Sequence, residues 1–325
     1  MEADERALLR STVETAIGDT MASATPAADG VDDALAGIGW AEMLQSEPRD
    51  AIEIVFGALG THNATATALD DVVASALGFE PQADVAVVLP TFGGWGAPGR
   101  IEGGRVDGVG LATARAASAR QLLVVCTAGS ELRIVTVARA DADITAVDGI
   151  DPDGGLRVVR TDAPATDGPA LDPSTWHSAV AAARRAVARQ IASADRAILA
   201  LARSHAVERV QFGRAVAGFQ AVRHRLADAI VAIEALEASV EAAWDEPSPQ
   251  AAALAKAVAG RTARTVAANC QQVLAGIGFT TEHPFHRFLK RTMALEGLFG
   301  SADEIVLDLG RTILTDRRVP TLLEL

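Results

Sequence analysis

Residues 207–228, VERVQFGRAVAGFQAVRHRLAD, join two long alanine-rich stretches that have the periodicity of helices. A connection between two helices needs only a few residues, yet this one concentrates arginine, glutamine, phenylalanine and glycine. Guanidinium groups bind anions through paired hydrogen bonds, and they stack on planar rings. Two interpretations are open from these residues alone: a site for an anionic or aromatic ligand, or a solvated loop in which Arg209 pairs with Glu208.

A second unusual stretch lies downstream at residues 270–291, CQQVLAGIGFTTEHPFHRFLKR. Gly276 and Gly278 predict the end of a helix, because glycine accepts the backbone conformation in which helices commonly end. Thr280 or Thr281 is then expected to cap the helix that follows. Taken alone, this stretch is typical of an ordinary glycine-terminated helix and turn.

Outward from these stretches, the hydrophobic patterns predict an α+β fold that is mostly α. We assign residues 1–80 to an N-terminal helical domain, on the basis of their amphipathic runs. Residues 81–165 contain short Val- and Ile-rich runs separated by Gly, Asp and Pro, which predict a small antiparallel β domain rather than a parallel βαβ sheet. Residues 166–325 predict long helices with short connections, which are typical of an antiparallel four-helix bundle. A core stripe is expected at Phe219, Val222, Leu226, Ile230, Ile233, Leu236 and Val240.

The composition argues against several classes of protein. The net charge is −13, whereas a nucleic-acid-binding protein needs a basic face. The two cysteines, Cys126 and Cys270, lie in apolar runs, so we expect buried free thiols. The scattered histidines predict no metal site. The N-terminus has no pattern of a signal peptide, and no stretch predicts a membrane span, so a cytoplasmic location is expected.

Residues 94–99, GWGAPG, match the glycine pattern of dinucleotide-binding folds and follow an apolar run. In those folds the pattern must open a helix whose N-terminus holds a pyrophosphate. Pro98 lies within this pattern, and the sequence that follows is typical of a hairpin. We therefore interpret residues 94–99 as a glycine-rich loop.

Taken together, the two stretches resemble the C-terminal half of the acyl-CoA dehydrogenase family. The order is R-x-Q-F-G, then Gln220 at the next helix, then a Gln–Gly turn followed by G-F-x-x-E-x-P. The resemblance covers residues 170–325 strongly, and the helix–β–helix order extends it weakly over the rest. It implies that residues of both stretches contact an FAD held mainly by a neighbouring subunit. Ala275 departs from the family, which usually has glycine there. The cofactor-contacting residues implied are Arg209, Gln211, Phe212, Gln220, Gln272, Val273 and Gly276.

The family oxidises acyl-CoA thioesters, and a carboxylate removes the α proton while a hydride passes to the flavin. The resemblance places this carboxylate at one of two positions, which Phe299 and Ala183 occupy here. Neither residue can accept a proton, so no catalytic residue is expected. Glu296 lies one turn away, about 5 Å along a helix, and a displaced base at this position stays an alternative. The β region also lacks the threonine-bearing loop that cradles flavin in the family.

The resemblance therefore implies the shorter, non-catalytic subunit of a heteromeric α2β2 dehydrogenase, similar to those of actinobacterial steroid side-chain degradation. A longer partner subunit would carry the catalytic Glu, the flavin cradle and most of a bulky acyl-CoA substrate. This chain would complete the partner's FAD site, so Arg209 and Gln220 are expected to face an interface. The alternatives are a self-sufficient acyl-CoA dehydrogenase with a displaced base such as Glu296, and a cofactor-free helical scaffold.

Overall fold

A computed structural model of the chain describes all residues except 23–27, 166–167 and 318–325. The N-terminal part is helical, as the amphipathic runs predict. Pro48 begins the fourth of these helices, where its missing N–H removes no helical hydrogen bond, and the left-handed Asn63 ends it. The helices are α1 (Ala3–Met21), α2 (Ala28–Gly37), α3 (Trp40–Ser46), α4 (Pro48–His62) and α5 (Ala68–Ala76).

The β region forms one mixed sheet, with strand order β6-β7-β3-β2-β4-β5-β8 and with β1 on β4. The prediction of an antiparallel sheet is wrong in two places, because β1 and β2 both run parallel to β4. Strands β1 and β2 pair with successive parts of β4, residues 121–123 and 126–127, on the edge of β4 opposite β5, so both run in the direction of β4. The strands are β1 (Val85–Val87), β2 (Gly99–Glu102), β3 (Arg105–Ala112), β4 (Gln121–Ala128), β5 (Glu131–Ala138), β6 (Ala142–Ala146), β7 (Arg157–Pro164) and β8 (Ala170–Leu171).

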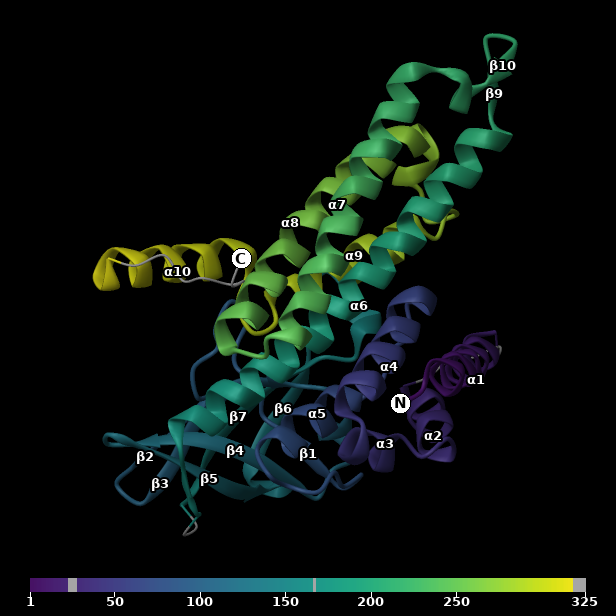
Figure 1. Cartoon of the computed structure of the whole chain (residues 1–325). Coiled ribbons are helices and arrows are strands. Elements are labelled where there is room, and N and C mark those ends of the chain that lie inside the picture. Colours follow the sequence, from purple (N-terminus) through teal and green to yellow (C-terminus); the bar gives the residue numbers. More distant parts are fainter. Residues whose placement is uncertain (23–27, 166–167, 318–325) are drawn as a thin grey trace.

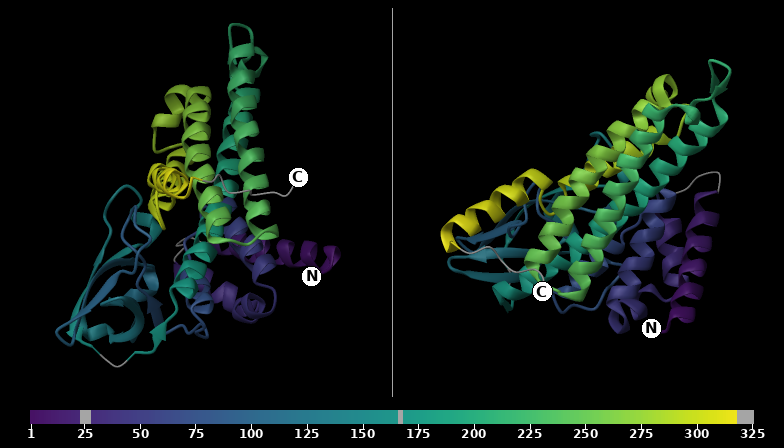
Figure 2. Two further views of the ribbon diagram at one scale, coloured as in Figure 1. Left: turned by 60° about the vertical axis from the view of Figure 1, so that its left-hand side comes forward. Right: turned by 45° about the horizontal axis from the view of Figure 1, so that its top comes forward.

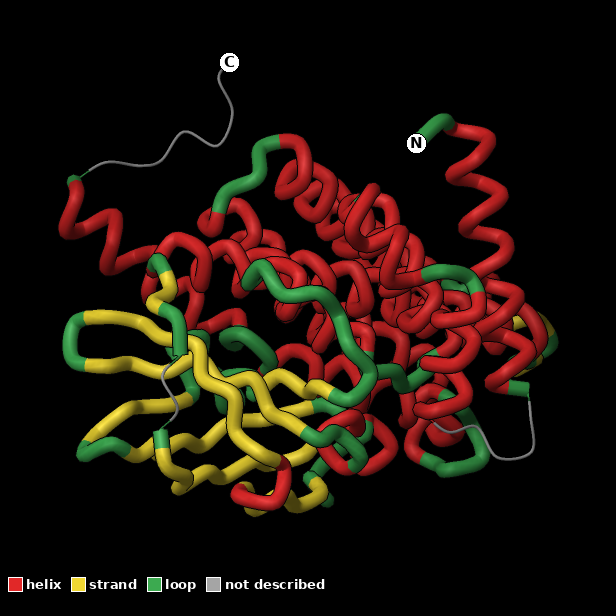
Figure 3. Tube along the Cα trace, turned by 90° about the horizontal axis from the view of Figure 1, so that it is seen from below, coloured by secondary structure: helices red, strands yellow, loops and turns green. Residues whose placement is uncertain are grey.

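The glycine-rich loop at residues 94–99 opens no helix. Gly99 begins strand β2, and a hairpin follows, as the interpretation of this loop predicts. Figure 3 shows the sheet gathered at one end of the molecule, with the helices beside it.

The C-terminal part is a bundle of α6 (Pro173–Glu208), α7 (Gln220–Asp245), α8 (Pro249–Leu274) and α9 (Phe285–Gly297). A further helix, α10 (Ala302–Asp316), projects sideways from it (Figure 1). Asp172 and Ser248 cap α6 and α8, because their side chains accept hydrogen bonds from backbone N–H groups of the first turn. The long α6 runs from the sheet to the far end of the bundle (Figures 1 and 2).

The core stripe expected on α7 is only partly buried. Ile233, Leu236 and Val240 face α6 and α8, whereas Ile230 is 41% exposed and Val231 is 67% exposed. The prediction for Ile230 is wrong, because α7 packs on the bundle through a narrow stripe that leaves its outer face uncovered. No helix of the described residues is long and apolar enough to cross a membrane.

The main core lies where α4 and α5 pack against α6. Small residues let the helices approach closely: a Cβ added at Gly60 would lie 2.2 Å from the backbone oxygen of Gln190. A buried polar network joins these helices to the sheet. Asp70 accepts hydrogen bonds from Val87 and Thr113, and burial raises its pKa to about 6. Cys126 and Cys270 are buried free thiols, as expected.

Candidate functional site

The connection between α6 and α7 forms a hairpin at the end of the bundle farthest from the sheet (Figures 1 and 2). Its strands are β9 (Val210–Gln211) and β10 (Arg214–Ala215). Phe212 and Gly213 form the turn with φ of 51° and 80°, both in the left-handed region. Positive φ at both central residues is the conformation of the tight turn that suits twisted strands. The Phe212 side chain is 92% exposed, so the hairpin presents an aromatic ring to its surroundings.

Several polar side chains of this hairpin and of the neighbouring helix start are exposed. Arg209 directly follows the last residue of α6, and Gln220 begins α7. The pairing of Arg209 with Glu208 is wrong among the described residues, because Glu208 accepts a hydrogen bond from Ser204 at 2.7 Å instead. No hydrogen bond or ion pair between described residues engages the side chains of Arg209, Gln211 and Gln220. Their donors are therefore free for a ligand.

The hairpin is held in shape by contacts among aromatic and cationic groups. The Arg214 guanidinium lies 4.1 Å from the centre of the Phe219 ring. The Phe212 and Phe219 rings meet edge to face with their centres 6.2 Å apart. Arg223 donates a hydrogen bond to the backbone oxygen of Ala217 at 2.8 Å. These contacts orient an otherwise exposed loop.

The second stretch lies at the same end of the bundle. Helix α8 ends at Leu274, and Ala275 then takes a φ of 53°, a value that favours glycine. Gln272 and Gly276 are exposed, and nothing lies within 4 Å of a Cβ added at Gly276. The Val273 side chain is buried, so the cofactor contact predicted for this residue would be made by its backbone.

One hydrophobic cluster brings the two stretches together. It contains Val216 and Ala217 from the base of the hairpin, and Val273 and Ile277 from the turn. On the opposite side of the turn, the predicted threonine cap is wrong: helix α9 begins at Phe285, and the Thr280 hydroxyl donates to Ile277. The N–H of Phe285, the first residue of α9, donates instead to the His283 ring at 3.2 Å, a contact that the sequence patterns did not indicate.

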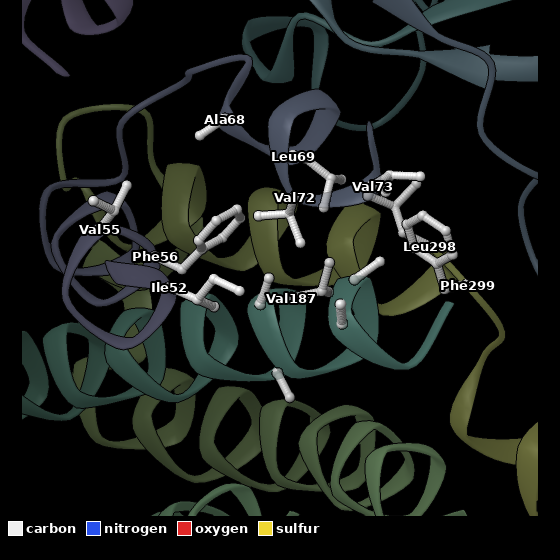
Figure 4. Close-up of a cluster of buried hydrophobic side chains, with 14 of the residues drawn as sticks. Ile52, Val55, Phe56, Ala68, Leu69, Val72, Val73, Val187, Leu298 and Phe299 are labelled. Atoms are coloured by element: carbon white, nitrogen blue, oxygen red, sulfur yellow. The ribbon is translucent and has the colours of Figure 1, made fainter. Parts of the chain in front are cut away.

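Both positions implied for the catalytic carboxylate are buried in the main core. Phe299 is 1% exposed and Ala183 is fully buried, and both belong to one hydrophobic cluster with residues of α4, α5 and α6. Figure 4 shows Phe299 and Leu298 beside Val73, with Phe56 and Val187 in the same layer. Neither position 299 nor position 183 carries a carboxylate.

The backbone around Phe299 is held by two buried cations. The Lys256 ammonium donates to the carbonyl oxygens of Glu296 at 2.6 Å and Gly300 at 2.9 Å, and Arg184 donates to that of Phe299 at 2.9 Å. Cations are favourable here because the C-terminal end of α9 exposes carbonyl oxygens. Burial lowers the pKa of Lys256 to about 7 and that of Arg184 to about 10.

Trp95 of the glycine-rich loop closes the same region from the sheet side. The Arg184 guanidinium lies 5.2 Å from the centre of its ring, and Gly300 packs against the ring edge. The Trp176 indole donates to the Trp95 backbone oxygen at 3.2 Å. The space next to Phe299 is thus filled by side chains of this chain.

Glu296, the alternative base, is engaged elsewhere. Its carboxylate accepts a hydrogen bond at 2.8 Å from the N–H of Ala302, which starts α10, and lies 3.9 Å from Arg264. A cavity beside Leu298, lined also by Gln190 and Arg291, has a volume of about 50 Å³. Pockets for small ligands usually measure about 300–1,000 Å³, so this cavity is too small for an acyl-CoA.

Comparisons with known proteins identify the C-terminal domain and the fold. Residues 176–314 match the model of the acyl-CoA dehydrogenase C-terminal domain. The chain is 40% identical over 119 residues to acyl-CoA dehydrogenase IpdE2 of Mycobacterium tuberculosis. That alignment spans 37% of this chain and 37% of the relative, so it leaves most of both proteins uncompared.

Solved structures with the same fold cover nearly all of the chain. A variant of the Tcur3481–Tcur3483 steroid ACAD has a TM-score of 0.82 at 22% identity, covering 97% of this chain and 99% of that one. The ChsE4–ChsE5 complex of Mycobacterium tuberculosis has a TM-score of 0.82 at 20% identity, covering 99% of both. A glutaryl-CoA dehydrogenase of Mycobacterium smegmatis in complex with FADH2 has a TM-score of 0.77 at 15% identity, covering 98% and 97%.

Proposed function

Since residues 176–314 match the acyl-CoA dehydrogenase C-terminal domain and the chain has the fold of acyl-CoA dehydrogenase structures, we propose that it is the non-catalytic subunit of a heteromeric FAD-dependent acyl-CoA dehydrogenase. A longer partner subunit carries the catalytic Glu, in an α2β2 assembly with one FAD per heterodimer. The substrate is a bulky acyl-CoA, such as a steroid side-chain thioester. The heteromeric relatives support the assembly and the substrate class.

The observation that carries this proposal is the filled position of the family's carboxylate. Phe299 and Ala183 lie in the main core, and Trp95 with Arg184 closes the space beside them. A base needs a proton-accepting group within hydrogen-bond reach of the substrate. Neither the residues nor the room for a substrate are present at this position.

The alternative of a self-sufficient enzyme with Glu296 as the base is less well supported. The Glu296 carboxylate caps α10 and faces Arg264, so moving it to a substrate would leave the Ala302 N–H without its acceptor. This position therefore has a structural role that explains its acidic residue.

The far end of the bundle fits a flavin nucleotide better than the filled position beside Phe299 does. The free donors of Arg209, Gln211, Gln220 and Gln272 suit a pyrophosphate and ring polar atoms, and the exposed Phe212 offers a stacking surface. FAD, when bound, supplies the hydride acceptor of the reaction. The residues of this chain bind and orient it from across an interface, while the partner holds the reacting part.

Replacing Arg209 by alanine in the co-expressed complex is expected to weaken FAD binding by about tenfold or more, because hydrogen bonds to a charged group contribute about 1.5–3 kcal/mol. FAD retention during gel filtration, measured by absorbance, checks this result. Arg105→Ala is the matched control, since Arg105 is an exposed arginine of the sheet that pairs with Asp162. An unchanged FAD content in the Arg209 variant would remove this residue from the site. It would favour the scaffold alternative.

A further inference from the structure

The turn between α8 and α9 contains a hydrogen bond that depends on the protonation of one histidine. The backbone N–H groups in the first turn of a helix have no acceptor within the helix. At the start of α9, Nδ1 of His283 accepts the N–H of Phe285 at 3.2 Å. An imidazole nitrogen accepts a hydrogen bond only when it carries no proton. The contact therefore requires the neutral form of His283.

His286, three residues later, makes a contact of the opposite kind. Its Nδ1 lies 2.8 Å from the backbone oxygen of His283. A carbonyl oxygen only accepts, so the His286 ring donates this hydrogen bond. Protonation of His286 keeps that donor, and its contact survives at low pH. The geometry thus assigns pH sensitivity to one histidine and not to its neighbour.

The surroundings of His283 oppose a positive charge. Burial lowers its pKa most, and the nearby rings of His205 and His286 lower it further. His205 lies in the last turn of α6, and the charged groups on the adjoining segments are Glu282 beside it in the chain and Arg287 in α9. The first turn of α9 has no acidic residue, and a helix N-terminus disfavours cations.

His205 also connects this turn to the hairpin. Its backbone oxygen accepts a hydrogen bond from the N–H of Arg209 at 2.9 Å. The contact of His205 with His283 therefore links both halves of the exposed surface: the residue that anchors Arg209, and the turn that follows Gln272 and contains Gly276.

We propose that His283 is a positioning residue that fixes the turn at residues 275–284 while it is neutral and releases the turn when it is protonated. Its contribution to the stability of the turn is complete above the ordinary histidine pKa of 6.5. That contribution falls as the pH drops below 6.5, because the unfolded turn takes up a proton more readily than the folded one. It levels off below the lowered pKa of the folded state.

The test is amide hydrogen exchange of the full chain, followed by mass spectrometry and corrected for the intrinsic effect of pH. Residues 275–284 and the start of α9 are expected to open about fivefold more often at pH 5.5 than at pH 7.5. This factor corresponds to the stability that is typically lost with one helix cap. His283→Asn keeps an accepting oxygen but does not titrate, so its protection is expected to be equal at both pH values. His286→Asn is the matched control and is expected to keep the pH dependence.

Two results would overturn the proposal: equal protection of the wild-type turn at both pH values, or loss of the pH dependence in His286→Asn instead of His283→Asn. The link to flavin rests on the proposed function and is measured separately, as FAD release from the co-expressed complex at pH 5.5. A turn that loosens without any release of FAD would uphold the role of His283. It would contradict the proposed cofactor contact of this turn.

Discussion

Replacing Phe299 by alanine is expected to lower the free energy of unfolding by about 3–5 kcal/mol, as is typical of large-to-small changes at a fully buried aromatic residue. The reason is structural: the ring lies among apolar side chains of α4, α5 and α6, at the position that the resemblance to the family implies for a catalytic carboxylate (Figure 4). Urea unfolding of the purified chain, or of the complex if the chain needs its partner, measures the change.

Phe212→Ala is the control for this prediction. Phe212 is exposed at the tip of the hairpin, so its replacement should change the free energy of unfolding little. A companion variant, Phe299→Glu, returns a carboxylate to the position implied by the family. It is expected to destabilise the chain without producing dehydrogenase activity, since the core leaves no room for substrate. A Phe299→Ala variant as stable as the wild type would contradict the filled site.

Replacing Arg291 by methionine is expected to lower the free energy of unfolding by about 3–5 kcal/mol, because it leaves the buried carboxylate of Asp151 without its partner. The Arg291 guanidinium, on α9, lies 2.5 Å from Asp151 and donates to the Ala64 backbone oxygen at 2.8 Å. Both side chains of the pair are about 95% buried. The pair joins the loop between β6 and β7 to α9, so urea unfolding should show the loss clearly.

The double variant Arg291→Met with Asp151→Asn removes the unpaired charge and is expected to recover part of the loss. Arg105→Met is the surface control, since the exposed pair of Arg105 with Asp162 should contribute little. An equal effect of the Arg291 and Arg105 variants would mean that burial of the pair does not determine its contribution.

Local patterns in the sequence predicted the helices well, because their apolar periodicity and caps are set within a few residues. The order and direction of the strands in the sheet could not be predicted from local patterns alone. The strand β2 runs parallel to β4 because of the path taken by residues 88–98, and no local pattern reports such a path. Ile230 has the spacing of a core residue, yet it is exposed, because burial depends on which neighbouring helices are present.

The residues of the candidate site come from the sequence motifs and stay a prediction, whereas the contacts that support them appear only in the fold. The motifs indicated Arg209 and Gln272, and the structure places both on the exposed far end of the bundle, as an interface contact requires. Lys256 and Arg184 resemble ordinary surface charges in helical sequence, and only the fold shows that they bind the carbonyl groups beside Phe299. The cap by His283 was missed because histidine is an uncommon capping residue.

We propose that this chain completes a partner's active site and has none of its own. The most direct measurement is the FAD content and acyl-CoA oxidation of this chain alone and of its complex with a longer family member. We expect one FAD per heterodimer, activity only in the complex, and loss of that activity when the partner's catalytic Glu is replaced. Purification of this chain alone as a homotetramer with one FAD per subunit and acyl-CoA dehydrogenase activity would contradict it.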